Sequence, residues 1–289
     1  MSLLDQKMRA DLQERLNGRE ISAAVDISKA IKDGVSTLGL PSYFFGNRGA
    51  KTVVVNLNPG EAADICDNSW RERTGNFGTS IDSFITDYAE RQRTYGEKFG
   101  VTPKGKADSF DVKQAAFLTP WVNSGIGLSS NPNWSDEETR NIAAKRVIDN
   151  KLQLELVPYA SAKFDFNSRN VNLLFPYVDM ILDEIFAQER KYIIFQSAKF
   201  EDIFKDYNKL HPCTFTLLPL DDDNNRVLLK EGGTLHGRCR VVKINYNGKS
   251  CNALIAHTFP NQGLSKAYDL MQKYGEFCYT EFHNSTIKK

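Results

Sequence analysis

The sequence has few cysteines, and they are not arranged in pairs. There are five, odd in number, widely separated and without a C-x-x-C motif: Cys66, Cys213, Cys239, Cys251 and Cys278. A disulfide framework uses an even set of grouped cysteines, and a structural zinc site uses clustered cysteine and histidine ligands. The spacing therefore argues against both, and a reducing compartment fits best.

Long apolar segments are also missing. The N-terminal stretch MSLLDQKMRADLQERL carries charges within its first turns, unlike the apolar core of a secretion signal, and no later run reaches about 18 apolar residues. We therefore predict a cytoplasmic protein with no membrane partner.

Neither sign of charge is in excess. Lys and Arg total 37, Asp and Glu total 36, and the formal net charge is +1. The chain as a whole thus offers no electrostatic attraction for a polyanion, and any basic surface has to be local.

What the sequence does have is enough apolar material for a large core. Hydrophobic residues make up 41% and aromatic residues 11% of 289 positions, which suits one large domain or two small ones. Apolar residues recur at helical spacing on both sides of Asn17-Gly18, within residues 3–38. We predict a single domain over residues 1–289, with residues 1–40 a helical N-terminal extension packed on it.

Strand and helix patterns alternate through the middle of the chain. Predicted strands cover 51–57, 151–159 and 191–200, with a further short strand within 113–125 that Pro120 ends. Predicted helices cover 81–95, 135–150 and 176–190, and Ser135 with Glu138 forms the capping box of the second. This rhythm favours an α/β fold, here a three-layer sandwich around a mainly parallel central sheet.

Residues 239–259 change the rhythm. Asn247-Gly248 separates two alternating apolar runs, which is a strong signal for a two-residue hairpin turn. We therefore expect an antiparallel hairpin added to the sheet.

Ligands of open α/β sheets bind outside the carboxyl ends of the strands, so the residues after each strand are the first candidates for a site. These segments are 56–60, 155–161, 196–197 and 257–260. After the first strand, Pro59-Gly60 forces a sharp exit that leaves the Asn58 side chain projecting into the crevice. An Asx-turn that closes the strand explains Asn58 as well, and His257 is also explained as a half-buried structural histidine.

Four short motifs, in order, resemble the uracil-DNA glycosylase superfamily. Asn58-Pro59-Gly60 after a V-V-V strand resembles its first motif, in the G-[IM]-N-P-G form of the mismatch-specific and single-strand-selective branches. TGNFG at 74–78 resembles its G-x-P-F-G element, and YIIFQSAKFEDIF at 192–204 resembles its I-V-A-L-G-x-x-A strand and helix. HTFPNQGLSKAY at 257–268 resembles its second motif, H-P-S-P-L-S-A-Y. The resemblance implies a uracil-DNA glycosylase-like fold and DNA or a nucleotide as partner.

The reaction that the resemblance implies is hydrolysis of the N-glycosidic bond of a base flipped out of DNA, without metal or cofactor. Asn58 and His257 are the implied catalytic residues: Asn58 holds the water, and His257 stabilises the departing base or contacts a phosphate. Phe77 would stack on the base. The implied base-binding residues are Phe77, Glu155, Asn56 and Gly60. The implied nucleic-acid backbone contacts are Tyr159, Ser161, Leu264, Ser265 and Lys266.

The sequence departs from the family at two positions that bear on the substrate. Asn56 replaces the first glycine of the motif, and Glu155 stands where the family carries an asparagine that reads the uracil edge. An amide both donates and accepts hydrogen bonds, whereas an ionised carboxylate only accepts. If Glu155 faces the pocket, the target is a base that offers amino or imino donors rather than uracil.

Each of these residues also has a structural explanation. Phe77 is equally a loop anchor packed into the core, Glu155 a helix cap or the partner of a lysine, and Tyr159 and Ser161 the end of a strand. Two explanations fit the basic residues around the hairpin: they contact a phosphate backbone, or their charge protects an edge strand from pairing. These residues are Arg238, Arg240, Lys243 and Lys249.

Three functions remain open on the sequence alone. The first is a DNA glycosylase acting on a base other than uracil. The second is a non-catalytic nucleic-acid or nucleotide binding module on the same fold. The third is an unrelated small-molecule α/β enzyme in which His257 is a general base, for which the sequence offers no acid partner.

Overall fold

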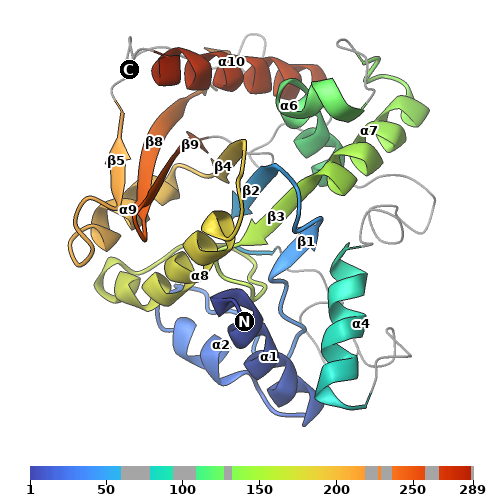
Figure 1. Cartoon of the computed structure of the whole chain (residues 1–289). Helices are drawn as coiled ribbons and strands as arrows, with labels where there is room; N and C mark the ends of the chain where they lie inside the picture. The colour runs from blue at the N-terminus through green and yellow to red at the C-terminus, as the bar shows by residue number, and fades with distance from the viewer. Residues whose placement is uncertain are drawn as a thin grey trace. The chain divides into compact units, whose positions relative to one another are not determined.

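A computed structural model of the chain describes residues 1–59, 79–93, 109–126, 132–218, 227–228, 236–257 and 267–287. The described helices are α1 (Leu3–Leu16), α2 (Ser22–Ile27), α4 (Ile81–Arg93), α6 (Ser109–Ile126), α7 (Glu137–Asn150), α8 (Phe175–Phe186), α9 (Lys199–Tyr207), α10 (Tyr268–Ile287) and the 3-10 helix η1 (Ser168–Leu174). The described strands are β1 (Phe44–Gly46), β2 (Thr52–Asn56), β3 (Lys151–Glu155), β4 (Tyr192–Gln196), β5 (Phe215–Leu217), β6 (Val227–Leu228), β7 (His236–Gly237), β8 (Cys239–Tyr246) and β9 (Lys249–Ala256). Figure 1 shows them along the chain.

The described strands form a mixed seven-stranded sheet in the order β1-β3-β2-β4-β9-β8-β5, beside a two-stranded pair, β6 and β7. β4 and β9 are parallel, while β8 pairs antiparallel with both β9 and β5. The segments that leave β2 and β3 also run parallel to each other. The N–H groups of Leu156 and Val157 donate to the carbonyl oxygens of Asn56 and Leu57, both at 2.9 Å. The predicted α/β class with added antiparallel strands is therefore confirmed.

Two compact units make up the chain. The first comprises Met1–Phe45, Val55–Gln92 and Gln153–Glu189, and the second comprises Gly46–Val54, Arg93–Leu152 and Arg190–Lys289. The predicted N-terminal helical segment belongs to the first unit, where α1 packs on α2 and α8. Leu4, Met8 and Leu12 form the buried stripe of α1, as their spacing predicts.

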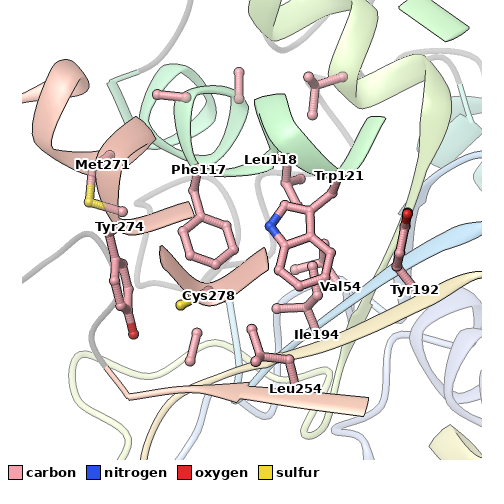
Figure 2. Packing of buried hydrophobic residues seen from close by; sticks show 14 of the residues in the cluster. Val54, Phe117, Leu118, Trp121, Tyr192, Ile194, Leu254, Met271, Tyr274 and Cys278 are labelled. Atoms are coloured by element: carbon pink, nitrogen blue, oxygen red, sulfur yellow. The ribbon is translucent and has the colours of Figure 1, made fainter. Parts of the chain in front are cut away.

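One face of the sheet in the second unit is covered by α6, α7 and α10. Figure 2 shows Phe117 of α6 between Tyr274 of α10 and Trp121 of α6, over apolar side chains of the strands. The ring centroids of Phe117 and Tyr274 are 5.3 Å apart. This cluster includes Ile194 of β4, whose neighbour in the strand, Phe195, points to the opposite face.

That opposite face is covered by α9. Phe200 and Phe204 of α9 lie 4.9 and 5.0 Å from the Phe195 ring, and Phe204 stacks on Phe215 of β5 at 3.8 Å. β4 is therefore buried on both faces, which explains its uninterrupted apolar sequence YIIF.

The predicted strand within 113–125 is wrong, because these residues lie in the 18-residue helix α6, which contains Pro120. The run Ala115–Leu118 is buried on every side, so it shows no period that separates helix from strand. Burial against α7 and α10 offsets the backbone hydrogen bond that a proline removes.

The start of α7 also differs by one residue from the prediction. Asp136, not Ser135, is the N-cap, and its carboxylate accepts from the Thr139 N–H at 2.7 Å. The hairpin is confirmed: Asn247 and Gly248 have φ of 48° and 75° and join β8 directly to β9.

Candidate functional site

Asn58 follows β2 in the first unit and ties this strand exit to the segment after β3. Its Nδ2 donates to the hydroxyl oxygen of Ser161 at 2.7 Å and to the Pro59 carbonyl at 2.9 Å, and it lies 3.4 Å from the Tyr159 carbonyl. Because all three contacts are acceptors, they identify which end of the Asn58 side-chain amide is the nitrogen and which is the oxygen. Oδ1 forms no hydrogen bond to any residue that the structure describes, so the protein holds the amide by its nitrogen and presents its oxygen as an acceptor.

Asn56 and Glu155, both predicted to contact the base, contact each other. Asn56 Nδ2 donates to Glu155 Oε1 at 3.1 Å, and Gln153 Nε2 donates to the same oxygen at 2.8 Å. Glu155 is 1% exposed, and Asn56 and Gln153 are buried as well. The carboxylate is therefore part of an internal polar network at the adjacent ends of β2 and β3, with at least two amide donors that help offset its burial.

Tyr159 lies in the segment after β3, and its hydroxyl contacts α1. It is 1% exposed, and its hydroxyl donates to Asp11 Oδ2 at 2.6 Å. The Tyr159 hydroxyl is thus engaged inside the first unit, and the predicted contact of Tyr159 with a nucleic-acid backbone stays a prediction. Ser161 is also buried, and its hydroxyl oxygen accepts from Asn58.

Asp11 of α1 organises a buried group that sequence reasoning missed. Its Oδ2 accepts from the hydroxyls of Tyr43 and Tyr159, each at 2.6 Å, and Tyr177 lies 3.3 Å from the Tyr159 hydroxyl. Burial raises the pKa of Asp11 to about 6, against the lowering effect of these hydrogen bonds, and burial likewise raises the pKa of Tyr43 and Tyr159. Asp11 and Tyr159 are separated by 148 positions, so no local pattern pairs them.

His257 directly follows β9 in the second unit and is hydrogen bonded to a residue that the sequence did not single out. Its Nε2 is hydrogen bonded to Oε1 of Glu201, from the first turn of α9. The Arg240 Nε of β8 lies 4.0 Å from the same carboxylate oxygen. The hydrogen bond from His257 holds the pKa of Glu201 below its usual value, with smaller contributions from the charges of His257, Arg240 and Lys205, while partial burial opposes the shift.

The strand pleat explains why these residues meet. Leu254 and Ala256 of β9 point into the cluster under α6 and α10, so Ile255 and His257 point to the face that α9 covers. Arg240 lies opposite Ile255 in the antiparallel pairing and so shares that face. The sequence analysis found no acid partner for His257. The one local feature that could have indicated Glu201 is its position in the first turn of a helix that follows a buried strand.

The remaining strand end is used for internal structure. Gln196 at the end of β4 is buried and accepts from Gln114 Nε2 of α6 at 3.1 Å. The Ser197 hydroxyl accepts from the Lys199 N–H at 3.2 Å, where α9 begins.

The basic residues of the hairpin do not share one face. Arg240 points to the α9 face, whereas Lys243 has the parity of Val241, which lies in the cluster on the other face. The predicted edge position is only partly right, since β5 pairs with β8 at Val242–Ile244.

Several predicted residues lie outside the described part of the chain, namely Gly60, Phe77, Leu264, Ser265 and Lys266. Among the residues that are described, Asn58, Tyr159 and Ser161 come together in the first unit, as do Asn56 and Glu155, and His257 belongs to the second unit.

Among the described residues, no group of three or more His, Cys, Asp or Glu side chains is placed to hold a metal ion. None of the helices in the described ranges has the length and apolar character needed to cross a bilayer. No model of a known protein family matches the chain, and no curated protein matches it. The geometry and the motifs are thus the basis for a functional proposal.

Proposed function

We propose that the protein is a divergent uracil-DNA glycosylase-like hydrolase that cleaves the N-glycosidic bond of a flipped base other than uracil. Asn58 would hold the attacking water, and His257 would assist departure of the base. The finer fold assignment, a uracil-DNA glycosylase-like sandwich, is part of the same proposal and rests on the order of the four motifs.

The observation that carries the proposal is the way Asn58 is held. A side-chain amide that positions water through its oxygen has to be fixed by its nitrogen, and Nδ2 of Asn58 has acceptors in Ser161, Pro59 and Tyr159. The residue also follows a strand whose five residues are all buried, at the carboxyl end where α/β enzymes place their reacting groups.

In this reaction the bond between C1′ of the sugar and the base nitrogen breaks, and the bonding electrons leave with the base. A water oxygen bonds to C1′ and its proton passes to solvent. The departing base gains negative charge, so a donor near it lowers the barrier. In the proposal, His257 supplies that donor.

A substrate other than uracil is supported by the residue type at position 155, where the acidic Glu155 replaces the family's edge-reading asparagine. The hydrogen bonds that Asn56 and Gln153 donate to Glu155 instead favour the second candidate, a non-catalytic nucleic-acid or nucleotide binding module, because a buried carboxylate engaged with neighbouring side chains is not presented to a base.

The first test measures base release from oligonucleotides that carry a panel of ordinary and damaged bases, read as alkali-labile abasic sites. For a base that is released, we expect Asn58→Ala to lower the rate by at least about 100-fold, because the water loses its acceptor. Asn170→Ala is the matched control, since it deletes an amide of the first unit that donates to the Lys29 carbonyl. Release that persists undiminished in Asn58→Ala would remove Asn58 from the mechanism, and no release from any substrate would favour the binding module.

A further inference from the structure

The contact between Glu201 and His257 restricts which ring nitrogen of the histidine can meet a substrate. Nε2 is engaged with the carboxylate, so in the neutral ring Nε2 carries the proton and Nδ1 is an acceptor only. Within the described residues, Nδ1 of His257 has no hydrogen-bond partner. The ring donates through Nδ1 only when both nitrogens are protonated.

We propose that Glu201 is the positioning residue of His257, and that it makes His257 a general acid that acts through Nδ1 on the leaving base. The inference rests on the proposed function for the identity of the leaving group, but not for the placement of the ring. It selects substrates whose base departs more easily when protonated, such as purines with basic ring nitrogens, over bases that depart as stabilised anions.

The proton balance of this step is complete. The imidazolium Nδ1–H passes its proton to the base as the C1′–N bond breaks, so the base leaves as a neutral molecule. The water that attacks C1′ releases one proton to solvent, and a solvent proton restores the imidazolium. Glu201 stays ionised throughout and keeps Nε2–H in place.

The charges that face this pair come from three elements. Glu201 and Lys205 belong to α9, Arg240 belongs to β8, and His257 directly follows β9. The Arg238 carbonyl oxygen accepts the backbone N–H of His257 at 3.0 Å, which fixes the backbone of the residue as well as its ring. Both side chains of the pair are mostly buried, at 20% and 17% exposed, so solvent competes little for the bond.

The ring geometry is tested on the full chain without any substrate. In protein labelled with 15N-histidine, we expect the Nε2 proton of His257 to exchange slowly with water, because it is held by the Glu201 carboxylate. Glu201→Gln, which keeps the shape and removes the charge, should speed this exchange by at least about tenfold. Asp202→Asn is the matched control, because it removes the adjacent carboxylate of α9, which pairs with Lys205 and not with His257.

The chemical role is tested on whichever base is released. The rate should fall as pH rises from acid to alkaline, because only the doubly protonated ring is an acid at Nδ1, and Glu201→Gln should lower kcat with little change in KM. A rate that instead rises over this range would make His257 a base and overturn the acid assignment. Unchanged exchange and unchanged kcat in Glu201→Gln would overturn the positioning role.

The two proposals fail in distinguishable ways. If no base is released from any oligonucleotide, the proposed function fails, and the exchange measurement alone decides whether Glu201 positions the ring. Should Glu201→Gln not fold, His257→Ala tests the same contact from the other side. The pKa of the Glu201 carboxyl, followed by 13C NMR, should then rise toward 4.5, and no change would overturn the inference.

Discussion

Asp11 carries a carboxylate where three tyrosine side chains meet, and this arrangement ties α1 to the segment that holds Asn58. Tyr159 donates its hydroxyl to Asp11, and its backbone carbonyl lies next to the Asn58 amide. Tyr43 donates to the same oxygen of Asp11, so the carboxylate satisfies two buried hydroxyls at once. The group thus couples the stability of the first unit to the protonation of one acid.

We predict that Asp11→Asn changes the pH dependence of stability in a defined window. The pKa of Asp11 rises from 3.8 to about 6, so between these values the folded chain binds more protons than the unfolded chain. The contribution of Asp11 to the free energy of unfolding is full below pH 3.8 and is lost as pH rises to about 6. The stability of the wild type minus that of Asp11→Asn should therefore fall by about 3 kcal/mol across this window.

Urea denaturation at a series of pH values measures this difference. Asp33→Asn, at an exposed position of the same unit, serves as control. A difference for Asp11→Asn that does not change with pH would mean that the Asp11 carboxyl titrates as it does in the unfolded chain.

Sequence reasoning at single positions worked where the chemistry is local and failed where burial decides. Asn58 lies just after a strand, as the proline that follows it, Pro59, predicts. His257 lies just after β9, as the apolar run of that strand predicts. Nothing in the sequence around Tyr159 indicates that its hydroxyl is buried, because the residue that accepts its hydrogen bond, Asp11, is remote in sequence. Glu201 is one of several acids in α9, and only the approach of β9 to that helix distinguishes it.

Two glycines show how elements constrain the chain in different ways. Gly248 has φ of +75° in the hairpin turn, with nothing within 4 Å of an added Cβ. Gly275 lies where α10 crosses α6, and a Cβ there would be 2.0 Å from the Phe117 carbonyl oxygen. The first is required by backbone conformation and the second by close packing of two helices.

We predict that Gly275→Ala destabilises the protein more than Gly248→Ala. The hairpin substitution should cost about 1 kcal/mol, the penalty for a side chain in the left-handed region. The helix substitution should cost about 3 kcal/mol or more, because the clashing atom is backbone and α6 has to move. Lys273→Ala, exposed on the same helix, is the control for the loss measured by urea denaturation.

Equal losses for the two glycine variants would show that α6 and α10 can separate without disturbing the cluster in Figure 2. The hairpin glycine follows from sequence, since Asn-Gly between alternating runs predicts a turn. The helix glycine does not, because α6 was predicted as a strand and its crossing with α10 joins segments that are distant in the chain.

Across the whole chain, the charge balance limits how nucleic acid can be bound. The formal net charge is +1, and Arg240 and Lys243 point to opposite faces of β8. Long-range attraction for a polyanion is therefore weak, and binding under the proposed function depends on recognition of a base rather than on many phosphate contacts.

This reasoning predicts a shallow salt dependence of oligonucleotide binding. The slope of log K against log salt concentration should have a magnitude below about 3, which corresponds to only a few released counterions. Fluorescence anisotropy with a single-stranded oligonucleotide at several salt concentrations measures it. A slope near −6 would instead reveal an extended basic surface.

The α/β class, the hairpin and the candidate strand ends follow from sequence because they depend on local periodicity and turn chemistry, which neighbouring residues determine. The pairing of Glu201 with His257, of Asp11 with Tyr159 and of Asn56 with Glu155 depends on contacts between residues far apart in the chain. Such contacts exist only when the sheet and its helices are assembled, since burial then sets which polar groups have to find one another. The tertiary structure thus places Glu155 in an internal network with Asn56, and it gives His257 the acid partner that the sequence did not show.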